Sequence, residues 1–443
     1  MLYKHPQPLP LIPAKEDILP TAQRHVVEKK RTIDAIINNV DISDARFETV
    51  LFPIANLDNK QSGEKAIISA LRYASPDAET QHTAEEAEKL WLELDGYVFG
   101  RLDLFKLVKG VKEKNESLDP ESAWLLNRTL LRYGQCGHGV LDEAGITNWH
   151  ARNSEIEDLC AKFNGNVRGY VPTDLCFTDD ELDGVPDGDL HGYPLDADGK
   201  RRVSLQWNNF ETICRYAHSP KTRKSISLAW GQRLSKNVPL FRRAILLRDE
   251  NARLLGYKSH ADYGIPHRMT ESAECVEKMI TRLTYSLTAE AKANFTRILR
   301  KKQELVAREQ PTDVVTEDVV LERFDISYYN KFINQQNGVD HEKIMEYFPL
   351  QHTFPLILGI YASYWQLRYE RIEKTDLIGH VWHEDVSVWS VWDERPASKG
   401  EFIGYLYADM VERQNKYRGN QCVNIQPVKK KAQIRAQKRK VAL

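Results

Sequence analysis

The densest group of potential metal ligands in this 443-residue chain is His380, His383 and Asp385. Imidazole nitrogens and carboxylate oxygens are common ligands of divalent metals. The segment from Val381 to Trp392 has the composition of a strand, and on a strand His380 and His383 point to opposite faces. Only His383 and Asp385 then share a face. This arrangement favours the polar face of a sheet strand over a metal site.

Two His-Glu pairs could begin a His-Glu-x-x-His motif, which places two imidazoles on one face of a helix. These pairs begin at His341 and His383. The position of the second histidine is occupied by Met345 in the first case and by Ser387 in the second. A thioether is a poor zinc ligand, and a serine hydroxyl does not replace an imidazole. Neither pair predicts a metal site.

Two further pairs of potentially reactive side chains are Cys136 with His138 and His260 with Asp262. Cys136 and His138 fall within the glycine-rich residues 134–139, which do not have the spacing of a dinucleotide-binding fingerprint. A thiol nucleophile needs a positioned base, and none is evident, so a loop between helices is predicted. His260 and Asp262 are two residues apart and face apart on a helix, which favours a role in helix capping. No catalytic or metal-binding residue is predicted.

The elements that would position these side chains are mostly helical up to about residue 366. Thr83 and Glu86 form a capping box ahead of an apolar stripe with three- and four-residue steps, which predicts a long amphipathic helix. Asp119 is the expected cap of the next helix, which has a proline in its first turn. Another helix is expected to begin at Thr270 and to end in three basic residues at Lys302, as the helix dipole favours.

The composition changes to that of strands near the C-terminus. Residues Val381–Trp392 and Phe402–Asp409 are rich in Val, Trp and Tyr, and they predict a pair of strands with a short third strand at 422–426. The pair carries more large apolar side chains than a hairpin covers by itself. We therefore expect exposed apolar surface and self-association.

The overall prediction is a mostly α fold, a large helical array with a small antiparallel sheet near the C-terminus. The expected organisation is an N-terminal helical domain (1–165), a connecting segment rich in Gly, Pro and Asp (166–206), a second helical region (207–366), a small β region (367–427) and a basic disordered tail (428–443).

Composition excludes several classes of protein. With 42% apolar and 28% charged residues, the chain is typical of a packed globular protein. Its longest apolar run, from Phe354 to Trp365, is well short of the roughly 20 residues that span a bilayer. The first residues lack the apolar core of a signal peptide. These features predict a cytoplasmic protein without a membrane partner.

The net charge of −1 hides an uneven distribution. Residues 429–443 contain seven bases and no acid, so residues 1–428 carry a net charge of −8. Only the tail resembles a nucleic-acid or nuclear-import patch. The acidic body argues against nucleic acid as a partner.

Longer strings in the chain are similar to those of a known family, the thimet oligopeptidase and saccharolysin type of zinc metallopeptidases. Residues 239–263 contain Leu-Leu-Gly-Tyr followed by His-Ala-Asp-Tyr, which resembles a specific helical segment of that family. Further similar segments are 325–329 (with Phe324 replacing the family's Trp), 347–350, 359–361, 381–386, 391–393, 402–405, Asp409 and 413–417.

The resemblance implies a helical, zincin-like peptidase whose two halves flank a channel. It also implies a zinc cofactor, hydrolysis of short peptides inside cells and a monomeric protein. In the family's mechanism two histidines and a glutamate hold the zinc, and the glutamate of His-Glu-x-x-His acts as general base.

The similarity ends at Pro427, where the family continues toward its zinc motif and this sequence continues with basic residues. No zinc ligand or catalytic residue of the family has a counterpart here. The sequence therefore predicts a peptidase-family protein that is incomplete before its zinc site, binds no zinc and is inactive as given. An error in the gene prediction and a natural short paralogue both explain this pattern. The competing function is a non-catalytic peptide-binding or structural protein.

Overall fold

The computed structural model describes residues 7–309, 319–336, 338, 341–417 and 419–425. The predicted basic tail at 428–443 lies outside the described residues. The fold is mostly α-helical with two small antiparallel sheets, as the sequence predicts. Among the described residues, no helix combines the length and the apolar composition that a bilayer span requires.

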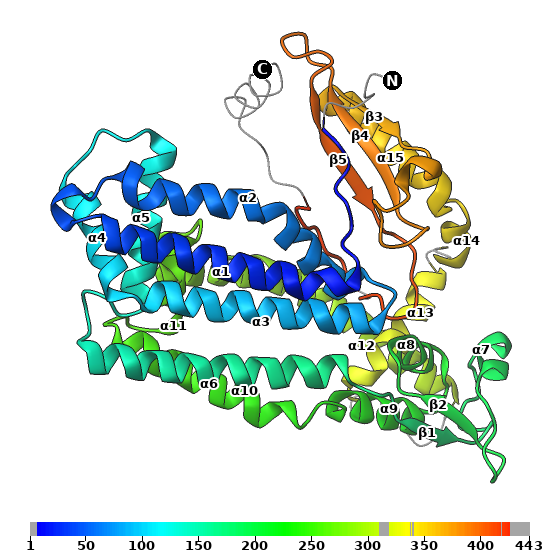
Figure 1. The fold of residues 1–443 in the computed structure, drawn as a ribbon. Helices are drawn as coiled ribbons and strands as arrows, with labels where there is room; N and C mark the ends of the chain where they lie inside the picture. The colour runs from blue at the N-terminus through cyan, green and yellow to red at the C-terminus, as the bar shows by residue number, and fades with distance from the viewer. Residues whose placement is uncertain (1–6, 310–318, 337, 339–340, 418, 426–443) are drawn as a thin grey trace. The chain divides into compact units, whose positions relative to one another are not determined.

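The chain forms two compact units (Figure 1). The first unit consists of Met1–Ile146 and Pro349–Leu443, and the second of Thr147–Phe348. The first unit begins with five helices, α1 (Lys15–Asn39), α2 (Phe47–Ala74), α3 (Ala78–Gly100), α4 (Leu102–Glu113) and α5 (Pro120–Gln135). It is completed by α15 (Leu350–Trp365) and by strands β3 (Leu367–Arg371), β4 (Ser387–Asp393) and β5 (Phe402–Ala408).

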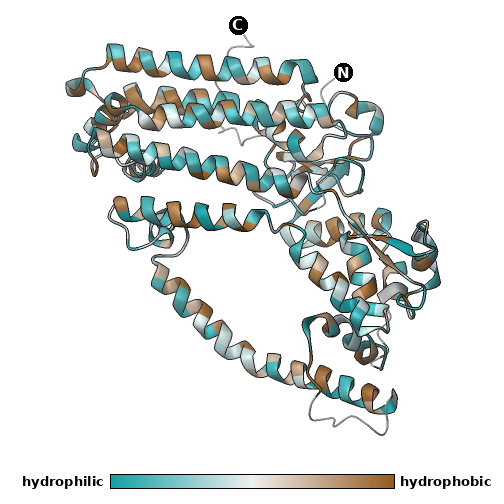
Figure 2. Cartoon of the chain, turned by 90° about the horizontal axis from the view of Figure 1, so that it is seen from below, coloured by the Kyte–Doolittle hydropathy of each residue, from teal (hydrophilic) through white to brown (hydrophobic). Residues whose placement is uncertain are grey.

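The helices of the first unit pack against one another through their apolar faces. Helices α1, α2 and α3 lie side by side, and Figure 2 shows hydrophilic and hydrophobic residues alternating along the long helices of the chain. Ile33, Val50 and Leu104 are almost fully buried in the shared core. Burying a side chain of this size stabilises the fold by about 1.5–3 kcal/mol. The first unit therefore has an extensive core of its own.

Two predicted helix starts have different outcomes. Asp119 caps α5 as expected, because its carboxylate accepts hydrogen bonds from the backbone N–H groups of Glu121 and Ser122. The capping-box prediction at Thr83 is wrong, because α3 already begins at Ala78. Its cap is Asp77, whose carboxylate accepts two backbone hydrogen bonds, while the Thr83 hydroxyl donates to a backbone carbonyl within the helix.

The sheet of the first unit has the strand order β3-β4-β5. Strand β5 matches the prediction. The strand predicted over 381–392 begins only at Ser387, as β4. The backbone N–H groups of Asp385 and Val386 instead bond to the ring and the carbonyl of His383, and such local bonds compete with a strand ladder. Residues 422–425 form no strand, and the third strand is β3.

Large side chains expected to be exposed at this sheet are covered. Val386 and Val388 are buried in a cluster that includes Leu9 from the N-terminal segment. This segment is fixed by a hydrogen bond from the Ile12 N–H to the Gly379 carbonyl. Apolar side chains that remain exposed in this part of the chain include a group on α15, namely Leu350, Leu356, Ile357, Ile360, Tyr361, Tyr364 and Trp365.

The second unit contains helices with one small sheet. Its elements are most of α6 (Glu143–Arg168), β1 (Asp174–Phe177), α7 (Asp187–Gly192), β2 (Arg201–Ser204), α8 (Trp207–Tyr216), α9 (Pro220–Gln232), α10 (Asn237–Leu254), α11 (His260–Gly264), α12 (Ala273–Glu309), α13 (Ile326–Gln336) and α14 (His341–Glu346). Strands β1 and β2 pair antiparallel within residues 166–206. A buried ion pair between Arg223 and Asp325, 2.8 Å apart, joins α9 to the start of α13.

Candidate functional site

The structure brings together His383 and Asp385 but not as a metal site. The Nδ1 atom of His383 lies 3.3 Å from Oδ2 of Asp385 and accepts a hydrogen bond from the Asp385 backbone N–H. His380 is used elsewhere, because its Nδ1 atom bonds to the carbonyl of Pro10 at 3.0 Å. The expectation that His383 and Asp385 lie together while His380 does not is therefore met, although a turn and not a strand produces it.

The zinc that the resemblance implies does not fit the residues that the structure describes. Across that part of the chain, no three His, Cys, Asp or Glu side chains lie close enough to hold a metal ion. A zinc site needs at least three protein ligands, and His383 with Asp385 supplies two. The side chains of His341 and Glu342, at the start of α14, lie outside the described residues. No chemical step is assigned to zinc here.

Cys136 and His138 have structural roles in the turn after α5. His138 is 2% exposed, and its Nε2 atom bonds to the Phe99 carbonyl at 2.8 Å. Burial raises the pKa of the Cys136 thiol to about 11, so the thiolate needed for nucleophilic attack is scarce at neutral pH. Gly137, with φ of 99°, allows the left-handed turn between them.

The predicted capping role near His260 belongs to a neighbouring residue. Ser259 is the N-cap of α11, and its hydroxyl accepts a hydrogen bond from the Asp262 backbone N–H. The same hydroxyl lies 2.7 Å from Oδ2 of Asp262, so the Asp262 carboxylate takes part in the cap. His260 itself stacks on Tyr263.

The feature best suited to ligand binding is a cavity of about 850 Å³ in the first unit, beside β5. Its wall includes all of β5, the end of α2 at Tyr73, the residues that follow β5, and part of the N-terminal segment. Within the described residues, β5 pairs only with β4, so its other edge has no strand partner. An unpaired strand edge presents backbone N–H and C=O groups in a row. The cavity therefore combines a large volume with main-chain hydrogen-bonding capacity.

Aromatic side chains give the cavity an apolar wall with a few polar atoms. Tyr407 stacks on Trp382, and Tyr73 meets Tyr417 edge to face. Burial raises the pKa of Tyr405 to about 12, so its hydroxyl stays protonated and donates to the Gln7 carbonyl. The buried hydroxyl of Tyr407 has no hydrogen-bond partner in the described part of the chain.

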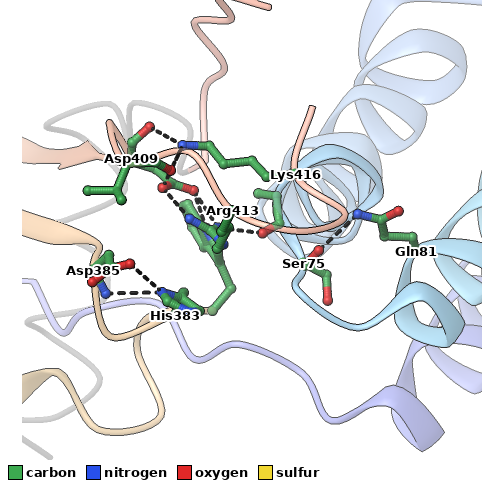
Figure 3. A network of polar contacts seen from close by, with 10 residues as sticks. Ser75, Gln81, His383, Asp385, Asp409, Arg413 and Lys416 are labelled. Carbon is green, nitrogen blue, oxygen red and sulfur yellow. Dashed lines mark hydrogen bonds and ion pairs between the residues drawn. The ribbon is translucent and has the colours of Figure 1, made fainter. Parts of the chain in front are cut away.

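A polar network centred on Asp409 fixes the end of β5 (Figure 3). The Asp409 carboxylate accepts hydrogen bonds from the Trp382 indole at 2.8 Å, from the Arg413 guanidinium at 2.6 and 2.8 Å, and from the Lys416 ammonium at 2.9 Å. Burial alone would raise the pKa of Asp409, but these donors outweigh it and lower the pKa to about 2. The carboxylate is therefore ionised at all physiological pH values.

The same network attaches the segment after β5 to the junction of α2 and α3. Arg413 also donates to the Ala74 carbonyl at 2.7 Å, and Gln81 bonds to the carbonyls of both Ser75 and Asn415 (Figure 3). Most of these contacts join residues more than 300 positions apart in the sequence. The sequence contains Asp409 and residues 413–417 as family-like strings, but their contact partners were not predictable from spacing.

A family match and several curated relatives point to the same group of proteins. The model of Peptidase family M3 matches residues 213–443, a range that extends past Pro427, the predicted end of the similarity. Oligopeptidase PhomG' of Diaporthe leptostromiformis is 26% identical in an alignment of 409 residues that covers 89% of this chain and 32% of that protein. A probable thimet oligopeptidase of Arabidopsis thaliana is 26% identical over 414 residues, covering 90% of this chain and 54% of the relative.

Saccharolysin of Saccharomyces cerevisiae is 27% identical over 384 residues, covering 84% of this chain and 51% of the relative. The chain thus spans about half the length, or less, of these curated relatives. The family model matches more than half of the chain, and the strings at 239–263 and 402–405 lie within the matched range. From this match we conclude that the chain belongs to peptidase family M3.

Proposed function

We propose that residues 1–443 bind short peptides in the cavity beside β5. The proposal rests on one observation. Within the described residues, β5 has one edge without a strand partner, and β5 lines a cavity of about 850 Å³. An extended peptide can add to such an edge as a further strand, with affinity from main-chain hydrogen bonds and selectivity from side-chain pockets. Three relatives are named as oligopeptidases or as a saccharolysin, which supports a peptide as the ligand.

The lining predicts which peptides bind best. Tyr73, Phe402, Tyr405 and Tyr417 contribute aromatic surface, and the charge of Lys416, which also lines the cavity, is already paired with Asp409. Side chains alternate along an extended peptide, so every second residue faces this wall. We therefore expect a preference for peptides with apolar side chains over strongly charged ones.

Peptidase family M3 is zinc-dependent, and its catalytic reaction is hydrolysis of peptide bonds. We propose that residues 1–443 bind peptides without cleaving them, because the described side chains do not supply three zinc ligands in one place. Hydrolysis by the longer relatives is then a property of the larger proteins. A monomeric state and the cytoplasm as compartment stay predictions from the sequence.

A cavity-filling substitution tests the peptide site. Gly404 lies in β5, and no heavy atom lies within 4 Å of the position that a Cβ would take there, so Gly404→Leu adds bulk to the cavity without backbone strain. Gly231 in α9 has the same free space but does not line this cavity, so Gly231→Leu is the matched control. Affinity for a fluorescein-labelled apolar peptide is measured by anisotropy.

We expect Gly404→Leu to weaken binding about tenfold or more, which corresponds to about 1.4 kcal/mol, and Gly231→Leu to leave it unchanged. Equal weakening by both variants would place the peptide elsewhere. If the wild-type chain binds no peptide, the alternative function, that of a structural protein, becomes the better description.

A further inference from the structure

A second cavity, in the other unit, contains buried polar atoms that have no partner among the described residues. It has a volume of about 310 Å³ and is lined by residues of α6, α10 and α11. On α6, Trp149, Asn153, Glu157 and Cys160 recur at three- or four-residue steps and therefore share one face of the helix. On α10, Arg248 and Asn251 face the same space.

Two buried residues of this wall lack hydrogen bonds that they should make. Trp149 and Asn251 are each 5% exposed. The indole Nε1–H of Trp149 and the Oδ1 atom of Asn251 have no partner in the described part of the chain. A buried polar atom left without a partner costs about 1–3 kcal/mol. The wall thus offers one donor and one acceptor to a molecule in the cavity.

The two charged groups of the cavity are not paired with each other. Among the described residues, Arg248 has no carboxylate partner, and its guanidinium donates to the Cys160 sulfur at 3.3 Å. Glu157 accepts a hydrogen bond from Asn153 at 2.7 Å, and burial raises the pKa of its carboxyl group. In this part of the chain, one cationic and one acidic group therefore face one small space, each without an opposite charge.

We propose that this cavity binds a small zwitterion, an apolar α-amino acid. Its carboxylate meets the Arg248 guanidinium and the Trp149 N–H, and its ammonium group meets the Glu157 carboxylate and the Asn251 Oδ1 atom. Guanidinium and carboxylate form strong charge-assisted hydrogen bonds, and a zwitterion satisfies both charges at once. The volume is at the lower end of the range for ligand sites, and Ile156 and Ala252 provide an apolar wall for the ligand's side chain.

The test compares L-leucine with two analogues that each lack one charged group, 4-methylpentanoate and 3-methylbutylamine. Binding to residues 1–443 is measured by calorimetry and by saturation-transfer NMR. We expect leucine to bind about tenfold or more tightly than either analogue, because each lost charged hydrogen bond weakens binding at least that much. Equal affinity for leucine and 4-methylpentanoate would overturn the proposal, as would the absence of saturable leucine binding.

Two variants locate the site, and a third controls for charge. Arg248→Gln should abolish leucine binding, and Glu157→Gln should lower leucine affinity to that of 4-methylpentanoate. Arg253→Gln, on the same helix, removes an exposed guanidinium that pairs with Asp249 and should have no effect. Unchanged leucine binding by a folded Arg248→Gln protein would contradict the proposal. If that variant does not fold, the comparison of analogues on the wild type still decides. This inference does not depend on the peptide site beside β5.

Discussion

The Asp409 network should contribute measurably to the stability of the first unit. The Asp409 side chain is 12% exposed, and the side chains of two of its partners, Arg413 and Lys416, are 9% and 15% exposed. The folded-state pKa of about 2 compares with an ordinary value of 3.8. Each pKa unit corresponds to about 1.4 kcal/mol, so the ionised carboxylate stabilises the fold by about 2.5 kcal/mol at pH 7.

Two substitutions separate the charge from the hydrogen bonds. Asp409→Asn removes the charge and should lower the free energy of unfolding by about 2–3 kcal/mol. Asp409→Ala also leaves two poorly exposed cations without an acceptor and should cost about 3–5 kcal/mol. The matched control is Asp95→Asn, because Asp95 pairs with Arg132 on the surface and such exposed pairs contribute about 1 kcal/mol or less.

The assay is urea unfolding followed by tryptophan fluorescence at several pH values. Because the folded pKa lies below the unfolded pKa, the stabilisation is fully present above pH 4 and is lost as the pH falls from about 4 to about 2. The difference between wild type and Asp409→Asn should therefore be largest at neutral pH and should shrink by pH 3. A difference at pH 7 no larger than that of Asp95→Asn would refute this account of the network.

Two further predictions concern accessible surface and thiol reactivity. The exposed apolar face of α15, which includes Leu356 and Ile360, should bind a hydrophobic dye and promote self-association, and a monodisperse monomer without dye binding would contradict this. Cys136, with its pKa raised to about 11, should react with iodoacetamide at pH 8 more slowly than the exposed Cys275, as measured by mass spectrometry of tryptic peptides. Equal rates at the two cysteines would show that the Cys136 thiol is not buried as described.

Local signals in the sequence predicted those elements that local interactions determine. The start of α5 depends on Asp119 and the first-turn Pro120, which act within one helical turn. Strand β5 has a composition that favours strands along its whole length. In contrast, β3 was not predicted, because its sequence Leu-Arg-Tyr-Glu-Arg is short and rich in charge. Its pairing with β4, in which Leu367 lies opposite Asp393, is a tertiary effect.

The candidate site shows the same division. The proximity of His383 and Asp385 could be predicted from a two-residue spacing, although the turn that produces it could not. The cavity beside β5 arises from contacts such as that of Arg413 with Ala74, which are remote in sequence. Hydrophobic periodicity carries no information about such pairings. The strings at 239–263 and 402–405 indicated the correct family without any information about these pairings.

The central claim, that residues 1–443 bind short peptides without cleaving them, is tested most directly by one experiment. A short apolar peptide is titrated calorimetrically into the purified chain in the presence of zinc, and the recovered peptide is analysed by mass spectrometry. We expect saturable binding and an intact peptide. Cleavage that a chelator abolishes, or the absence of any binding, would contradict it.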